Sequence, residues 1–92
     1  DNLIRYPSKQ SMILMRLYPT GSLNRFEAER MGDHCLHSTI STLVHAHGLT
    51  FVRRSEKVRT RFDGMTTVTR YWLDSSARER AANLLNSWGV ML

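Results

Sequence analysis

The chain has 92 residues, with 41% hydrophobic and 23% charged side chains, a composition typical of a folded domain rather than a disordered chain. Its formal net charge of +5 favours polyanions as partners. A single cysteine excludes an internal disulfide framework, and no apolar run is long enough to span a membrane. We therefore expect one domain over residues 1–92, with an N-terminal arm at residues 1–7, in a reducing cytoplasm.

Two short helices are predicted in the first third of the chain. Ser8 is a good N-cap for the first helix, because its hydroxyl can accept a hydrogen bond from a free amide of the first turn. Residues 22–23 are expected to be a link. Asn24 with Glu27 three residues later is a capping-box pattern, which predicts a second helix over about residues 24–31.

A third helix is predicted over about residues 35–46, because apolar side chains recur there at helical spacing. Gly32 suits a left-handed turn between the second and third helices, and Gly48 ends the third helix. Two short helices joined by such a turn form a helix-turn-helix, in which the second helix of the pair enters the major groove of DNA. The side chains expected in the core are Leu36, Ile40, Leu43, Val44 and His47.

The solvent side of this third helix carries polar side chains without a lysine, arginine, aspartate or glutamate. Its members are His37, Ser38, Ser41, Thr42 and His45, with His34 at the entrance of the helix. Small hydroxyl groups let a helix lie deep in a groove, and Ser, Thr and His can hydrogen-bond base edges or phosphates. Exposed helices of basic proteins usually carry more charge, so this face favours DNA contact over simple surface decoration.

A basic hairpin is predicted after the third helix, from a strand that begins near Leu49 to a return strand at residues 66–73. Asp63-Gly64 between them is a strong signal for a two-residue hairpin turn. The cations of the hairpin are Arg53, Arg54, Lys57, Arg59 and Arg61, against Glu56 alone. Charged edge strands also prevent aggregation, but such edges usually mix signs, so we favour a phosphate clamp.

A last helix is predicted from Ser75 or Ser76, with Ser76 and Glu79 as a second capping box. It is expected to bury Ala77, Ala81, Leu84, Leu85 and Trp88. This stripe, continued by the apolar end of the chain, is wide enough to serve the core alone or also a homodimer seam. The order of helices and strands predicts an α+β fold with a small antiparallel sheet.

No catalytic, cofactor or metal site is expected. The histidines near Cys35 could form at best a partial site, because only residues three or four apart share a helix face. Cys35 itself lacks an orienting carboxylate and is expected to be a small buried residue rather than a nucleophile. Tyr71, Trp72 and Trp88 are expected to pack in the core rather than to stack on bases.

The segments 21–32 and 36–48 together resemble the winged helix-turn-helix superfamily, in particular its small members from phages and mobile elements. The residues that carry the resemblance are Leu23, Glu27, Ala28, Gly32, Leu36, Ile40, Leu43 and Gly48, with Asn24 where threonine is usual. The resemblance implies an α+β fold with three helices, a two- to three-stranded antiparallel wing and a C-terminal helix. It also implies binding to double-stranded DNA, with residues 35–46 in the major groove and the wing, residues 53–65, on the backbone or minor groove.

The process served is open at this point. A bacterial or phage transcriptional regulator is the first expectation, and a recombination or replication accessory factor the second. The alternative from another class is a phage-encoded interaction module that inhibits a host nucleic-acid-processing complex. Binding to plain duplex DNA separates these classes, because an inhibitor should bind its protein target and ignore DNA.

Overall fold

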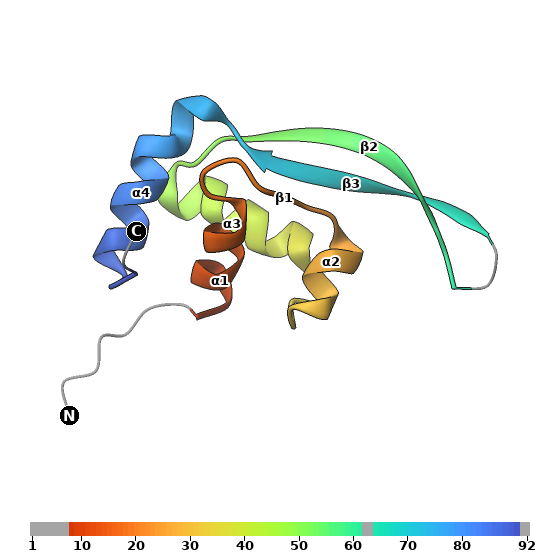
Figure 1. Cartoon of the computed structure of the whole chain (residues 1–92). Helices are drawn as coiled ribbons and strands as arrows, with labels where there is room; N and C mark the ends of the chain where they lie inside the picture. Colours follow the sequence, from red (N-terminus) through yellow and green to blue (C-terminus); the bar gives the residue numbers. More distant parts are fainter. Residues whose placement is uncertain (1–7, 62–63, 91–92) are drawn as a thin grey trace.

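The computed structural model describes residues 8–61 and 64–90 and has an α+β fold with four α-helices and a three-stranded sheet in that part of the chain (Figure 1). The expected arm, residues 1–7, lies outside the described residues. The elements are α1 (Ser8–Leu17), β1 (Ser22–Leu23), α2 (Arg25–Arg30), α3 (Leu36–His47), β2 (Phe51–Arg59), β3 (Met65–Leu73), a 3-10 turn (Ser75–Ala77) and α4 (Arg78–Ser87). None of the described helices is long and apolar enough to cross a membrane.

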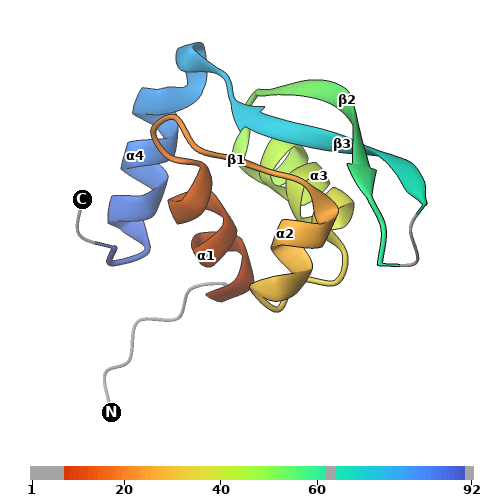
Figure 2. The ribbon, with the colours of Figure 1, turned by 45° about the vertical axis from the view of Figure 1, so that its right-hand side comes forward.

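The sheet has the order β1-β3-β2 with both pairs antiparallel. The expectation that residues 22–23 form a link is wrong: Ser22 and Leu23 pair with Trp72 and Tyr71 as a short edge strand. A strand of two residues is too short to show an alternating pattern, so only its neighbour β3 reveals it. The hairpin β2–β3 extends beyond the helices, and its distal end curves down beside α2 (Figures 1 and 2).

The turn of the hairpin differs from the two-residue Asp63-Gly64 turn that the sequence predicts. The amide of Thr60 donates to the carbonyl of Gly64 at 2.8 Å, and the amide of Gly64 donates to the hydroxyl of Thr60 at 3.1 Å. Residues 62–63 lie outside the described residues. The pairing of Phe51 with Leu73 at the base fixes this register, because a shift by one residue would move buried side chains to the solvent face.

The core lies between the base of the sheet and α1, α3 and α4. Leu36, Ile40 and Leu43 of α3 are buried as expected, whereas Val44 and His47 are only partly buried. Tyr71 and Trp88 are buried, while Trp72 is half-buried. The core residues of the remaining elements are Ile13, Leu14, Leu17, Leu23, Ala28, Leu49, Phe51, Leu73, Ala77, Ala81 and Leu85.

Helix ends follow the local signals in one case and depart from them in another. The capping box at α2 is confirmed: the Glu27 amide donates to Asn24 Oδ1 at 3.0 Å, and the Asn24 amide donates to Glu27 Oε1 at 3.1 Å. The second capping box is wrong, because Ser76 Oγ donates to the Asp74 carboxylate at 3.0 Å and α4 begins only after the 3-10 turn. Ser76 lies inside the 3-10 turn rather than at the N-cap of α4, which is Ala77, so its hydroxyl is not placed to accept from the first turn of the helix.

Candidate nucleic-acid interface

The hairpin is a ribbon with two unlike faces, because successive residues of a strand point to opposite sides. One face, here called the cationic face, carries exposed side chains along both strands: Arg53, Ser55, Lys57 and Arg59 of β2 with Met65 and Thr67 of β3. The opposite face carries Glu56 and Arg70 in its middle, where Val68 is 6% exposed. In the outer half of the hairpin, the exposed cations Lys57 and Arg59 therefore lie on one face and the buried Val68 on the other.

The two faces rest on different parts of the molecule. At the base of the hairpin, Phe51, Tyr71 and Leu73 lie on the cationic face and join the core. Farther out, the opposite face is tied to α2 through Arg70 and Glu27, and Val68 is buried there outside the main core. The ribbon thus crosses from the core to α2, which leaves the outer part of the cationic face open to solvent.

Tyr71 joins the cationic face to α3. The guanidinium carbon of Arg53 lies 5.6 Å from the centroid of the Tyr71 ring, and His37 Nδ1 lies 3.4 Å from the Tyr71 hydroxyl. His37 belongs to the polar side of α3, and Arg53 begins the row of cations on β2. The two surfaces predicted to contact DNA therefore meet at Tyr71, although they come from separate parts of the chain.

The polar side of α3 is exposed as expected, apart from the half-buried Ser41. Some of its hydroxyls are already engaged: Thr42 Oγ1 donates to the Ser38 carbonyl at 3.1 Å, and Ser38 Oγ lies 3.0 Å from Cys35 Sγ. Each keeps free acceptor lone pairs for a further partner. The exposed members of this side are His34, His37, Ser38, Thr42 and His45.

Two of the five predicted hairpin cations lie apart from the cationic face. Arg54 lies on the opposite face, where it pairs in register with Arg70. Arg61 follows the end of β2 and lines a groove between the hairpin and α2. The structure therefore places Arg53, Lys57 and Arg59 on one face of the hairpin, with Arg53 linked to α3 through Tyr71, and separates Arg54 and Arg61 from that row.

Arg70 is the centre of an ionic network that the sequence analysis missed. Its Nε donates to both carboxylate oxygens of Glu56 at 3.0 Å, its two terminal nitrogens donate to Glu27 at 3.0 Å, and Nη1 also donates to Ser22 Oγ at 2.8 Å. Asn24 Nδ2 donates to Glu56 at 2.8 Å. One guanidinium thus links all three strands to α2.

The network changes the electrostatics of the hairpin. Hydrogen bonds from Arg70 hold the pKa of both Glu27 and Glu56 below the ordinary value, and hydrogen bonds to the two carboxylates raise the pKa of Arg70. The Arg70 side chain is 20% exposed, so it presents little charge to solvent. Because Glu56 is neutralised by Arg70, no hairpin carboxylate in the described residues offsets the cations of the open face.

The entrance of α3 also differs from the expectation. Cys35 is exposed rather than buried, because it is the residue before α3 and its thiol turns outward to Ser38, whose hydrogen bonds lower the pKa of Cys35. The residue buried here is Asp33, which is 1% exposed. Its carboxylate accepts from the Cys35 amide at 2.9 Å and from Thr39 Oγ1 at 2.6 Å, with Lys9 Nζ at 3.9 Å. The described residues hold no group of three or more potential metal ligands.

The apolar stripe of α4 serves the core of the monomer. Ala81 and Leu85 are fully buried, and Trp88 packs edge-on against His47 with ring centroids 5.3 Å apart. Leu84 and Val90 are only partly buried. Among the described residues, the stripe therefore leaves Leu84 and Val90, rather than the whole helix face, for contact with a partner.

Comparison of the chain with protein-family models, curated proteins and solved structures finds no match. The central features of the candidate interface are the open row of cations on the hairpin, the uncharged polar side of α3, and the contact of both with Tyr71.

Proposed function

We propose that this chain is a DNA-binding protein of winged-helix type, in which α3 lies in the major groove and the hairpin acts as the wing. The observation that carries the proposal is the continuity at Tyr71, where the polar side of α3 meets the cationic face of the hairpin. A helix and a β-ribbon that share one surface can contact a duplex together, the helix at base edges and the ribbon at phosphates.

The charges support duplex DNA as the partner. Arg53, Lys57 and Arg59 are exposed and have no carboxylate partner among the described residues. Each phosphate that such a side chain neutralises releases counterions, which adds to affinity without adding sequence preference. Arg59 at the end of β2 brings this row toward the backbone or the adjacent minor groove, where arginine is favoured.

The topology supports the winged-helix assignment. The pair α2–α3 is joined by a short turn in which Gly32 has φ of 98°, a left-handed conformation that favours glycine. The strand that precedes α2 pairs with β3, so the helix pair and the hairpin are parts of one sheet-anchored unit. For the process served, we propose a transcriptional regulator or a recombination or replication accessory factor of bacterial or phage type, acting in the cytoplasm.

A salt-titrated mobility-shift assay with a random duplex tests the proposal, followed by selection of bound sequences from a random pool. We expect the logarithm of the affinity to fall linearly with the logarithm of the salt concentration. A protein that ignores duplex DNA at low salt contradicts the proposal and favours the other class, an interaction module that inhibits a host complex.

We also propose that the protein pairs on DNA, because a single recognition helix reads only a few base pairs. The seam would involve Leu84 and the C-terminal end, since the rest of the α4 stripe lies in the core. Analytical ultracentrifugation of the free and DNA-bound protein, with and without residues 90–92, measures this. One protein per site in both states contradicts pairing and leaves α4 as a core element.

A further inference from the structure

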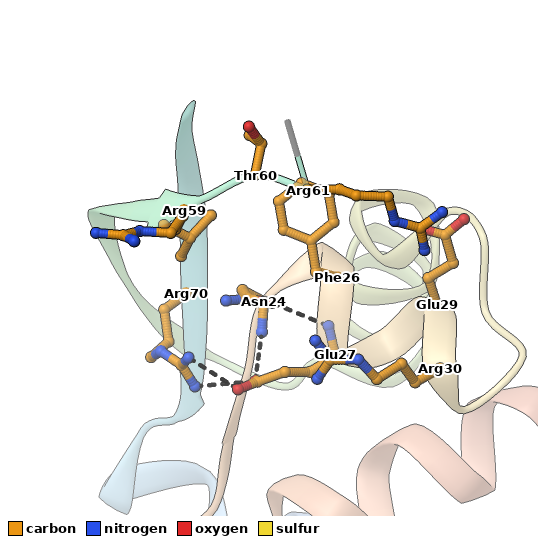
Figure 3. Close-up of a pocket in the computed structure, with 10 residues that line it drawn as sticks. Asn24, Phe26, Glu27, Glu29, Arg30, Arg59, Thr60, Arg61 and Arg70 are labelled. Atoms are coloured by element: carbon orange, nitrogen blue, oxygen red, sulfur yellow. Dashed lines mark hydrogen bonds and ion pairs between the residues drawn. The ribbon is translucent and has the colours of Figure 1, made fainter. Parts of the chain in front are cut away.

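A second site lies on the other side of the hairpin, away from the cationic face. The end of the hairpin and α2 enclose an open groove of about 1020 Å³. Figure 3 shows the Phe26 ring rising from α2 into the space below Thr60, while Arg61 extends from the hairpin over α2. The Arg59 side chain turns away from α2, in agreement with its place on the cationic face.

Some charged side chains of this groove have a partner of opposite charge and others do not. Four arginines line it against two glutamates: Arg30, Arg59, Arg61 and Arg70 against Glu27 and Glu29. Glu27 is paired with Arg70 at 3.0 Å, and the carboxylate of Glu29 lies 3.6 Å from His34. Arg30 and Arg61 have no carboxylate partner among the described residues and outnumber the exposed Glu29, so the balance of free charge in the groove is positive.

The groove also has an aromatic platform and a fixed floor. The guanidinium carbon of Arg25 lies 4.9 Å from the centroid of the Phe26 ring, which shows that the ring already receives a planar cation on one face. Asn24 is held by Glu27 and Glu56, and Val58 adds apolar surface. Because Arg70 ties this floor to the hairpin, the groove is formed before any ligand arrives.

We propose that this groove binds an unpaired nucleic-acid strand, with a base on Phe26 and phosphates on Arg30 and Arg61. Positive grooves that contain an aromatic ring hold single strands in this way, whereas the bases of a duplex are stacked on each other and cannot reach such a ring. The protein would then recognise a junction between duplex and single strand. This inference rests on the proposed function in one respect: a duplex on the cationic face delivers the strand to the groove.

The test compares three labelled probes by fluorescence anisotropy: a blunt duplex of about 20 base pairs, the same duplex with an overhang of about six thymidines, and the thymidine strand alone. We expect the overhang to raise affinity about tenfold over the blunt duplex, since one stacked base contributes roughly that factor. Phe26→Leu and Arg30→Ala should each remove most of this gain while blunt-duplex affinity stays unchanged.

Arg78→Ala is the matched control, because Arg78 is also an exposed helical arginine without an ion pair among the described residues but lies outside the groove. It should leave the overhang gain intact. Phe26→Leu keeps an apolar side chain, and its thermal unfolding is compared with that of the parent; Arg30→Ala alters only an exposed side chain, so its result stands if the first variant is unstable.

The outcomes separate this inference from the proposed function. Equal affinity for blunt and overhang probes, with duplex binding intact, overturns the groove proposal alone. Binding of the overhang and the free strand in a Phe26- and Arg30-dependent way, without blunt-duplex binding, supports the groove and overturns the duplex proposal. Displacement of the overhang by a short polyglutamate peptide at lower concentration than by thymidine strand also overturns the groove proposal, and assigns the groove to an acidic protein segment.

Discussion

The two faces of the hairpin use arginine in opposite ways. On the face tied to α2, Arg70 donates to Glu27, Glu56 and Ser22, and its side chain is 20% exposed. On the cationic face, Arg53 and Arg59 are exposed and have no carboxylate within reach among the described residues. Arginine therefore stabilises the fold on one face of the hairpin and is free to bind a ligand on the other.

The difference depends on the distance to a carboxylate. A guanidinium whose N–H groups already donate to two carboxylates has little free charge to offer a phosphate. An unpaired exposed guanidinium that neutralises a phosphate releases counterions from the nucleic acid, which adds to affinity. Counting arginines along the hairpin overstates the clamp, because Arg70 belongs to the scaffold. Counting carboxylates overstates the negative charge of the hairpin in the same way, because Glu56 is neutralised by Arg70.

The largest effect is expected from removing cations at the distal end of the hairpin. Lys57→Ala with Arg59→Ala should weaken binding to every duplex by about 60-fold near 0.1 M salt and reduce the slope of log affinity against log salt by about 1.8, roughly 0.9 for each lost phosphate contact. Mobility shifts across a salt series measure both quantities. Arg78→Ala is the control, and an unchanged slope in the double variant would remove the hairpin from the DNA site.

Removing the paired arginine should affect stability rather than salt dependence. Arg70→Met leaves the partly buried carboxylates of Glu27 and Glu56 without a cation, and we expect the free energy of unfolding to fall by about 2 kcal/mol. Urea denaturation measures the change. Arg54→Met is the matched control, because Arg54 stands directly opposite Arg70 but is exposed and has no carboxylate partner in the part of the chain that the structure describes; similar losses in both variants would contradict the assignment.

Changes on the polar side of α3 test whether this helix reads bases, which neither face of the hairpin is expected to do. Ser38→Ala, Ser41→Ala or Thr42→Ala should each lower the preference for a selected site by about 1 kcal/mol, while affinity for random duplex stays the same. Competition assays with selected and random duplexes give the preference directly. If selection returns no consensus, the protein is architectural, and α3 positions it on the duplex without reading the bases.

The smallest effect is expected from the pH dependence of stability, and we expect it from the carboxylates paired with Arg70. The pKa values of Glu27 and Glu56 are lowered in the folded protein, so their pairing stabilises the fold above the ordinary carboxyl pKa of 4.5 and is lost as pH falls through the lowered values. Stability should be level from neutral pH to about 5 and fall below about 4.5. Urea titrations of Arg70→Met at the same pH values should show a shallower acid decline, and an identical decline would argue against the pairing.

Much of the fold follows from short-range signals in the sequence. The capping box of Asn24 and Glu27, the left-handed Gly32 and Gly48, and the apolar spacing of α3 each involve residues a few positions apart, so the interactions they make are visible in the sequence itself. The cations at 53–61 were also evident. Their division between the two faces of the hairpin also follows from the sequence, because alternate residues of a strand point to opposite sides.

The remaining features depend on residues that only folding brings together. Arg70 and Glu27 are 43 positions apart and His37 and Tyr71 are 34 apart, and many other pairs of the same types could have met instead. The edge strand β1, the register that pairs Thr60 with Gly64, and the exposure of Cys35 beside the buried Asp33 were likewise decided by packing. The sequence by itself determined the helices, the cap of α2 and a cationic hairpin, because these depend on local hydrogen bonds and composition. Only the tertiary structure decided which cations are neutralised and which are free, because electrostatic pairing depends on distances of a few ångströms between remote segments.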